Sequence, residues 1–280
     1  MIRRLRPKTR GMRRAFPLRL LFLPVFGACA ISQQQEVQLG TSYAAQIDSQ
    51  LPLIRDPQVV SYVNVLGDSL AKVTDTRGLD WHFNIVDSKE VNAFAVPGGW
   101  IYINRGLIER AQNMSQVAGV IGHEIGHVTR RHTVQQMQQA QGANIGVALA
   151  CTLTKVCESG LGQNAINIGG SALFAKFSRT DEQQADQEGV KTTVKARIDP
   201  NGVPDMFRIL LEERRTNPGA VDAFFASHPL EEDRITATQA QIASYPASQL
   251  RGLTKDTQGF QTFKRRLMAL PPSPAPRKRQ

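Results

Sequence analysis

The 280-residue sequence predicts an α+β fold, mainly helical, with a small mixed sheet. Apolar residues recur at helical spacing over long segments, and three short segments between residues 81 and 104 are rich in β-branched and aromatic residues. With 41% hydrophobic and 21% charged residues, the composition is that of a globular protein that can bury a sizeable core. No internal repeat of 20–50 residues is apparent, so we expect one folded domain.

In the N-terminal half, helical spacing predicts helices at 37–51, 56–73, 106–110 and 115–131. Alternation and residue type predict strands at 81–86, 93–96 and 100–104. Pro97-Gly98-Gly99 stands between the last two strands and is typical of a turn. The sheet is therefore expected directly before the longest apolar helix.

In the C-terminal half, further helices are predicted at 171–197, 204–215, 231–244 and 260–270. Residues 141–170 are rich in Gly, Ala and Asn and are expected to form a loop or hairpin over the core. Their longest apolar run, 145–151, is too short to cross a bilayer, which needs about 20 residues. The Pro-rich, basic segment 271–280 is expected to be a disordered tail.

The net charge of +10 is concentrated at the two ends of the chain. Residues 1–28 hold eight Lys and Arg and no acid, and the last ten residues hold three more. Without them the net charge of residues 29–270 is −1. We therefore expect no nucleic acid partner, because such proteins carry a basic face on the folded domain.

Residues 1–28 are typical of a bacterial export signal, with Met1 or Met12 as the start. A basic stretch precedes the apolar run 20–28, which suits a signal peptide and is too short for a membrane span. The run ends in Phe-Gly-Ala before Cys29, which resembles a lipoprotein cleavage site. We expect lipid on Cys29 and a protein anchored to the periplasmic face of the outer membrane; ordinary cleavage near Cys29 is the alternative.

Cys151 and Cys157 remain as a pair if Cys29 carries lipid. An exported protein sits where disulfides persist. On one continuous helix, residues six apart would be about 9 Å apart along the axis, beyond the reach of a disulfide. A disulfide would need the helix to end between them, so both a bridge and two free thiols stay open.

The sequence His123-Glu124-Ile125-Gly126-His127 matches H-E-x-x-H within the helix predicted at 115–131. Positions i and i+4 share one helix face, so both imidazoles can bind one ion, and we expect one zinc ion per chain. Glu124 would lie beside the metal, take a proton from a water on it and pass the proton to the leaving amine. The alternative is a surface helix that carries two histidines by chance.

The third zinc ligand is expected from the helix predicted at 171–197, where Glu182 and Asp186 lie one turn apart. The metzincin alternative, a third histidine six residues after the second, is absent. We assign Glu182 as the ligand and expect Asp186 to accept the free ring N–H of a ligand histidine. Asp181 and Glu188 are weaker candidates because they point off that face, and an exposed acidic face is the alternative.

Several separated motifs stand in order along the sequence: Asn92-Ala93-Phe94-Ala95-Val96-Pro97-Gly98-Gly99-Trp100, the H-E-I-G-H helix, Glu182 with Asp186, and His228-Pro229 with Arg234. Together they resemble the HtpX/Oma-like gluzincin zinc metallopeptidases, relatives of the CAAX prenyl protease. The likeness runs over residues 32–270, and the lipid-anchored periplasmic members look most similar. The resemblance implies a gluzincin peptidase domain with its sheet beside the H-E-x-x-H helix.

The resemblance also implies roles for residues outside the metal set. The strand Asn92, Ala93, Phe94 and Ala95 would pair with substrate backbone, so that unfolded envelope proteins are the expected substrates; a buried core strand is the alternative. His228 and Arg234 would approach the zinc, stabilising the oxyanion or supplying a transient fourth ligand, against the alternative of a solvated loop and surface pair.

The sequence therefore predicts a metalloendopeptidase acting in proteolytic quality control of the envelope. The alternative class is a zinc-bound periplasmic chaperone or assembly factor with little proteolysis. An intact Glu124 argues against that alternative, because a structural zinc site needs no general base. His82 and His132 look structural or exposed and receive no role. The substrate, the oligomeric state and the partner proteins stay open.

Overall fold

The structure, a computed structural model, describes residues 31–140, 176–229 and 232–274. The elements in order are α1 (Gln33–Gln50), α2 (Pro57–Thr74), β1 (His82–Val86), β2 (Ala93–Val96), β3 (Trp100–Asn104), α3 (Arg105–Arg110), α4 (Met114–Thr129), a helical stretch at 132–140, α6 (Arg179–Lys195), α7 (Gly202–Thr216), the 3-10 turn η4 (Pro218–Ala220), α8 (Asp222–Ser227), α9 (Glu232–Ala243), α10 (Ala247–Leu250) and α11 (Gln258–Ala269). The predicted α+β class, mainly helical with a small mixed sheet, is confirmed.

Local sequence explains where the first two helices begin. The Ser32 hydroxyl accepts from the Gln35 N–H, and the Gln35 side chain accepts from the Ser32 N–H, forming a capping box at α1. At α2 the Asp56 carboxylate accepts two backbone N–H groups, and Pro57 occupies the first turn. These caps satisfy N–H groups that a helix start leaves unpaired.

The three strands form one mixed sheet in the order β1-β3-β2. β1 runs parallel to β3, and β2 runs antiparallel to it. The tight β2–β3 turn needs glycine, since Gly98 and Gly99 have φ values of 82° and 105°. A side chain at Gly99 would also stand 2.4 Å from the Asp80 carbonyl oxygen. β2 is thus an edge strand among the described residues.

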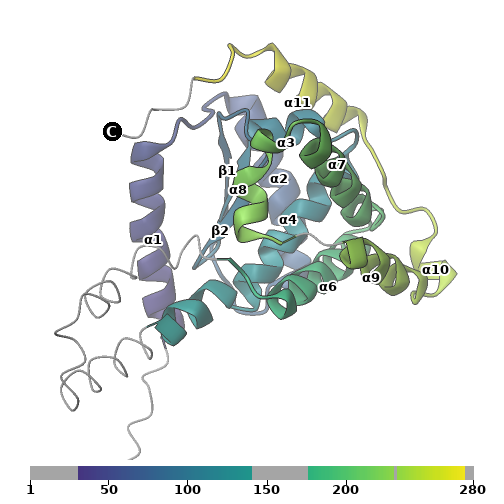
Figure 1. Cartoon of the computed structure of the whole chain (residues 1–280), viewed down its shortest axis with the longest axis horizontal. Coiled ribbons are helices and arrows are strands. Elements are labelled where there is room, and N and C mark those ends of the chain that lie inside the picture. Colours follow the sequence, from purple (N-terminus) through teal and green to yellow (C-terminus); the bar gives the residue numbers. More distant parts are fainter. Residues whose placement is uncertain (1–30, 141–175, 230–231, 275–280) are drawn as a thin grey trace, which may run out of the picture. The chain divides into compact units, whose positions relative to one another are not determined.

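Both faces of the sheet are covered by helices. Along β3, Ile101 and Ile103 join the main core, whereas Tyr102 joins a smaller cluster on the opposite face. α2 and α4 pack against the sheet on the main-core side. The smaller cluster includes Ile47 of α1 and Val134 of the 132–140 helix. In Figure 1, α4 runs through the middle of this arrangement, between the strands and α6.

The helix crossing that shapes the rest of the molecule is that of α4 and α6, which meet through small residues. A Cβ added at Gly122 would be 3.2 Å from the Gly189 Cα, and one at Gly126 would be 3.1 Å from the Ala185 Cα. Glycine and alanine at the crossing let the two backbones approach closely. The face of α6 that carries Glu182 is thereby laid against the H-E-x-x-H face of α4.

The structure corrects several predicted helix limits. The helix predicted from residue 171 begins at Arg179, because residues 176–178 are not helical and the Ser178 side chain caps it. The helix predicted to reach residue 131 ends at Thr129, and a second one starts after Arg131, whose φ is 62°. The short helix α8 occupies residues 222–227, where no helix was predicted.

The start of the predicted tail is ordered. The Pro271 carbonyl accepts from Arg105 at 2.6 Å, and the Ser273 hydroxyl donates to Asp87 at 2.7 Å. The signal segment with Cys29, and the segment 141–170 with Cys151 and Cys157, lie outside the described residues. None of the helices within the described ranges is long and apolar enough to cross a membrane.

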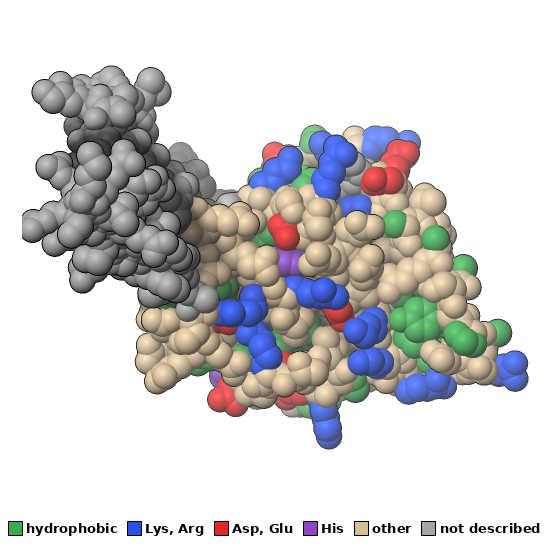
Figure 2. Space-filling view, turned by 90° about the horizontal axis from the view of Figure 1, so that it is seen from below, with side chains coloured by type: hydrophobic (Ala, Val, Ile, Leu, Met, Phe, Trp, Pro, Cys, Tyr) green, Lys and Arg blue, Asp and Glu red, His purple; other side chains and the backbone are tan. Residues whose placement is uncertain are grey.

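Charges on the described surface are mixed. On the face seen in Figure 2, Lys and Arg side chains lie singly or in small groups, with acidic side chains between them. Large exposed apolar side chains among the described residues are limited to Val37, Val65 and Met268. Most of the other large apolar side chains in the described part of the chain are buried or partly buried in the two core clusters.

Candidate metal centre

The two motif histidines converge as their spacing predicts. His123 and His127 lie one turn apart on α4, and their Nε2 atoms are 3.0 Å apart. Both are buried, with 4% and 1% exposure. Ile121 and Ile125 of the same helix are fully buried in the main core and hold α4 in place. The face that carries the histidines is therefore fixed by the packing of these two isoleucines into the core.

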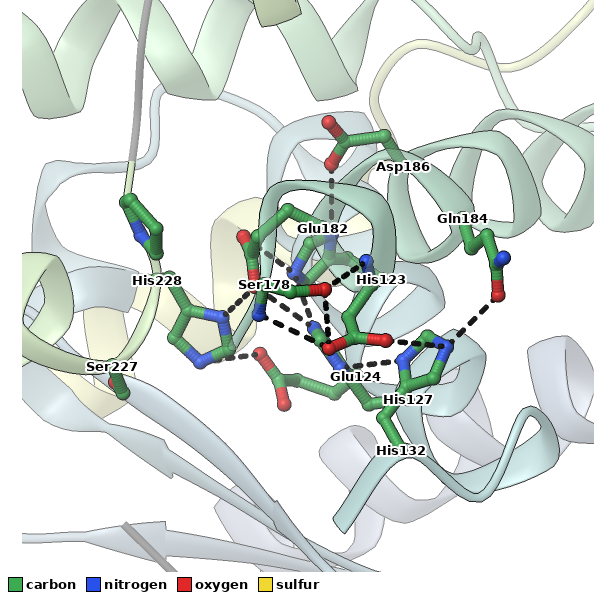
Figure 3. Close-up of polar contacts among 12 residues, drawn as sticks. His123, Glu124, His127, His132, Ser178, Glu182, Gln184, Asp186, Ser227 and His228 are labelled. Carbon is green, nitrogen blue, oxygen red and sulfur yellow. Dashed lines mark hydrogen bonds and ion pairs between the residues drawn. The ribbon is translucent and has the colours of Figure 1, made fainter. Parts of the chain in front are cut away.

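α6 and the end of α8 complete a cluster of four donors (Figure 3). Glu182 places Oε1 3.3 Å from His127 Nε2 and Oε2 3.7 Å from His123 Nε2. His228 brings Nδ1 to 3.0 Å from Glu182 Oε1. One ligand atom from each of these four buried residues lies within 4.8 Å of the others. Nitrogen and carboxylate donors gathered in this way fit a transition metal ion.

Asp186 orients the first histidine. Its Oδ1 accepts from His123 Nδ1 at 2.9 Å, so the His123 proton is held at Nδ1 and its Nε2 lone pair faces the cluster. The geometry predicted for Asp186 is therefore present. A carboxylate that contacts a ligand histidine in this way also raises the basicity of the ligand.

Arg234 of α9 neutralises the buried acids. Its Nε and Nη2 donate to the two Asp186 oxygens at 2.7 and 2.6 Å. Nη1 lies 2.6 Å from Glu182 Oε2 as an ion pair without hydrogen-bond alignment, and it donates to the Pro229 carbonyl at 2.9 Å. The pKa of Arg234 is raised, because Asp186 and Glu182 outweigh its burial. The guanidinium of Arg234 is thus occupied by its contacts with the carboxylates of Asp186 and Glu182.

Glu124 is buried beside the cluster and differs from the other acids. Neither of its carboxylate oxygens has a hydrogen-bond partner among the described residues, and His228 Nε2 is 3.8 Å from Oε1. Burial raises the pKa of Glu124, and the neighbouring His228 and His123 oppose that rise only in part. A buried carboxylate with unused acceptor positions is suited to proton transfer.

The pKa values of the other cluster residues reflect the balance between burial and neighbouring charges. Burial holds the pKa of His127 well below its ordinary value, which favours the neutral form that binds metals. Burial would raise the pKa of Glu182, but His228 and His127 hold it well below its usual range. Burial would lower the pKa of His228, yet Glu182 and Glu124 raise it. The cluster therefore keeps Glu182 ionised.

Two buried residues at the site were missed in the sequence. His132 is 1% exposed, so the exposed alternative is wrong; its Nδ1 lies 3.0 Å from His127 Nδ1 and its Nε2 3.1 Å from Gln184 Oε1. Phe177 lies with its ring centroid 4.0 Å from that of His127. The sequence signal for His132 was hidden because a helix continued to residue 131 would have carried it off the His127 face.

The weaker candidates lie outside the cluster. Asp181 caps α6 by accepting from Ser178, and Glu188 pairs with Arg130 at 2.6 Å. His82 stacks on Trp100, with ring centroids 3.8 Å apart. These side chains have structural partners of their own.

The substrate strand proposed from the resemblance is β2, which packs against α4. The Asn92 carbonyl accepts from the Asn104 N–H at 2.9 Å, continuing the β2–β3 pairing by one residue. Ala93 and Ala95 are buried, and the Phe94 ring stacks on Tyr102 at 5.0 Å. β2 is thus both the sheet edge and a strand with buried side chains, two descriptions that had been alternatives.

The sequence pattern of peptidase family M48 matches residues 57–242, which hold the sheet, α4, α6 and nearly all of α9. The chain belongs to peptidase family M48. The gluzincin family expected from the motifs is thereby confirmed, and the predicted enzyme class, a metalloendopeptidase, agrees with it.

Several named relatives of the chain are bacterial proteases. The chain is 30% identical over 240 residues to a putative beta-barrel assembly-enhancing protease of Vibrio cholerae, covering 84% of this chain and 49% of that protein. It is 31% identical over 223 residues to the beta-barrel assembly-enhancing protease of Escherichia coli K12, covering 76% and 45%. Metalloprotease LoiP of the same strain is 28% identical over 217 residues, covering 75% and 81%. The chain spans about half the length of the first two.

Proposed function

We propose that this M48 chain is a zinc-dependent metalloendopeptidase that cleaves unfolded or misassembled envelope proteins. The observation that carries the proposal is the buried set of His123, His127, Glu182 and His228 with Glu124 beside it, whose carboxylate accepts no hydrogen bond from the described residues. Imidazole and carboxylate donors in a compact cluster are the set that catalytic zinc uses. One zinc ion per chain would be held by His123, His127 and Glu182.

Zinc in this position would act as a Lewis acid on the scissile carbonyl and lower the pKa of a bound water. Glu124 takes a proton from the attacking water and passes it to the amide nitrogen, so that the C–N bond breaks into a carboxylate and an amine. Asp186 and Arg234 hold His123 and Glu182 in place during this step. Burial raises the pKa of Glu124 above that of an ordinary glutamate, which brings it closer to neutral pH.

His228 is proposed to guard the site. Its ring is part of the four-donor cluster and is 1% exposed, so it can supply a fourth ligand in the resting enzyme. The residue ends α8, where its N–H donates to the Phe224 carbonyl at 2.8 Å, and Pro229 follows. Moving this helix end would withdraw the imidazole. Stabilisation of the oxyanion by His228 is the second role, and the sign of one rate change separates the two.

Substrate backbone is proposed to pair with the edge strand at Asn92, Ala93, Phe94 and Ala95. Pairing through the main chain reads few side chains, which favours extended, unfolded polypeptides. The names of the Vibrio cholerae and Escherichia coli beta-barrel assembly-enhancing proteases refer to beta-barrel assembly, and this supports substrates in the bacterial envelope.

We further propose that residues 1–28 are a lipoprotein-type signal peptide, that 29–270 form one peptidase domain and that lipid on Cys29 anchors it at the periplasmic face of the outer membrane. The basic and apolar run before Cys29 supports the export signal. Mass spectrometry of the mature N-terminus should find acylated Cys29. An unmodified N-terminus further along the chain would rule the anchor out.

Casein digestion with and without a chelator tests the proposed activity. The wild type should bind about one zinc ion per chain and cleave casein until the chelator removes the metal. Glu124→Gln should keep the zinc and the fold but lose hydrolysis, because its carboxylate moves protons and is not a ligand. Cleavage retained by this variant would sink the mechanism, and zinc binding without cleavage by the wild type would favour the chaperone alternative.

A further inference from the structure

We infer that His132 is a positioning residue that sets the tautomer and ring orientation of His127 for metal binding. The inference rests on the proposed zinc site. His127 turns Nε2 toward His123 and Glu182 and turns Nδ1 toward His132 Nδ1, 3.0 Å away. The two rings are nearly perpendicular, at 78°, and both are almost fully buried.

Only one placement of the ring protons on His127 and His132 leaves His127 able to bind a metal ion. To bind through Nε2, a neutral His127 must carry its proton on Nδ1. That proton is donated to His132 Nδ1, which must then be bare. His132 carries its own proton on Nε2, where Gln184 Oε1 is 3.1 Å away and can only accept. In both hydrogen bonds, from His127 to His132 and from His132 to Gln184, a donor then meets an acceptor.

The opposite placement of the ring protons conflicts with metal binding by His127 and with the contact between His132 and Gln184. If His132 carried its proton on Nδ1 and donated it to His127, the His127 proton would sit on Nε2 and point into the donor cluster. The bare Nε2 of His132 would then face the carbonyl oxygen of Gln184, and two acceptors would oppose each other. The orientation of the Gln184 side chain and the need for an Nε2 lone pair on His127 thus select the same tautomers.

His132 is held rigidly in this position. Arg131, with φ 62°, makes the turn that brings His132 back onto the His127 face. The Arg131 Nε donates at 2.7 Å to Glu36, a fully buried carboxylate that also accepts from Arg77 at 2.9 Å. Beyond His132, Val134 packs into the smaller core. Contacts from α1 therefore fix a turn that is remote from α1 in sequence.

α6 consequently supports both α4 ligands. Asp186 accepts directly from His123, and Gln184 acts on His127 through His132. The two supports differ in charge, because Asp186 is a carboxylate and His132 a neutral ring. Loss of such an outer partner typically weakens metal binding by about 10–100-fold.

The test compares His132→Leu, which removes the acceptor, with His132→Asn, whose Oδ1 can accept near the position of Nδ1. Zinc dissociation constants would be measured by competition with a chromogenic chelator. The leucine variant should bind zinc about 10–100-fold more weakly than the wild type, and the asparagine variant should recover most of that loss. His82→Leu, a histidine that stacks on Trp100 away from the cluster, is the control and should bind zinc as the wild type does.

Long-range proton–nitrogen NMR on the zinc-loaded wild type gives a second readout that needs no variant to fold. It should show His132 protonated on Nε2 and His127 protonated on Nδ1. A proton on His132 Nδ1, wild-type zinc affinity in His132→Leu, or equal losses in the leucine and asparagine variants would each overturn the inference. A wild type that binds no zinc would instead refute the proposed function.

Discussion

Replacing Gly126 with alanine puts a methyl group into the crossing of α4 and α6. The new Cβ would lie 3.1 Å from the Cα and carbonyl oxygen of Ala185 and 3.1 Å from the Cβ of Glu188. Carbon atoms pack best at about 3.5–4.0 Å. Two of the three neighbours are backbone atoms and cannot rotate away, so α6 itself would have to shift by a few tenths of an ångström.

The expected cost is the balance of two effects. Overpacking a well-packed site costs about 1–3 kcal/mol, whereas alanine in a helix is favoured over glycine by about 1 kcal/mol. The free energy of unfolding should therefore fall by about 0–2 kcal/mol. The effect on the metal should be larger, because α6 carries Glu182 and metal–ligand distances tolerate only about 0.2 Å. We expect zinc affinity to fall about tenfold or more, a loss of about 1.4 kcal/mol or more.

Gly259→Ala in α11 is the matched control. Its added Cβ would meet Tyr62 and Thr257 at 3.6 and 3.7 Å, which is ordinary contact. It should stabilise the fold by about 0.4–1 kcal/mol and leave zinc binding unchanged. Urea unfolding and chelator competition on both variants provide the comparison. If Gly126→Ala gains as much stability as Gly259→Ala and binds zinc as tightly as the wild type, the crossing does not set the ligand geometry.

Glu182→Ala should lose zinc, and Asp186→Ala should bind it about 10–100-fold more weakly, by elemental analysis and chelator competition; full zinc content in Glu182→Ala would make His228, the remaining donor of the cluster, the third ligand. His228→Ala should raise basal cleavage of an unfolded substrate at unchanged zinc content if the residue guards the site, or lower turnover by about 10²–10³-fold if it stabilises the oxyanion; an unchanged rate would reject both roles. Burial lowers the pKa of His132, so this side chain binds a proton more readily in the unfolded chain than in the folded one. The free energy of unfolding of the metal-free wild type should therefore decrease as pH falls below about 6.5, by up to about 1.4 kcal/mol per pH unit. His132→Asn cannot take up that proton, so urea unfolding should show the stability difference moving in favour of the variant between pH 7 and 5; a constant difference would contradict the assigned shift.

Much of the local structure could be predicted from the sequence because its causes lie within a few residues. The β2–β3 turn was predicted from Pro97-Gly98-Gly99, and the positive φ values of its glycines explain why. The spacing of His123 and His127 predicts their convergence, since it depends only on the helical period. Helix limits were less predictable, because the end of α4 depends on the turn at Arg131, whose side chain is bound by Glu36.

Only the tertiary structure decided how the site is held together. His123 and Asp186 are 63 positions apart, and Arg234 is 48 positions from Asp186. Their contacts exist because α4 and α6 cross through small residues and α9 packs on α6. His132 reaches His127 only through a break in the helix. Local periodicity encodes which side chains share a face, whereas the meeting of two faces depends on the packing of whole helices, and that is set by contacts remote in sequence.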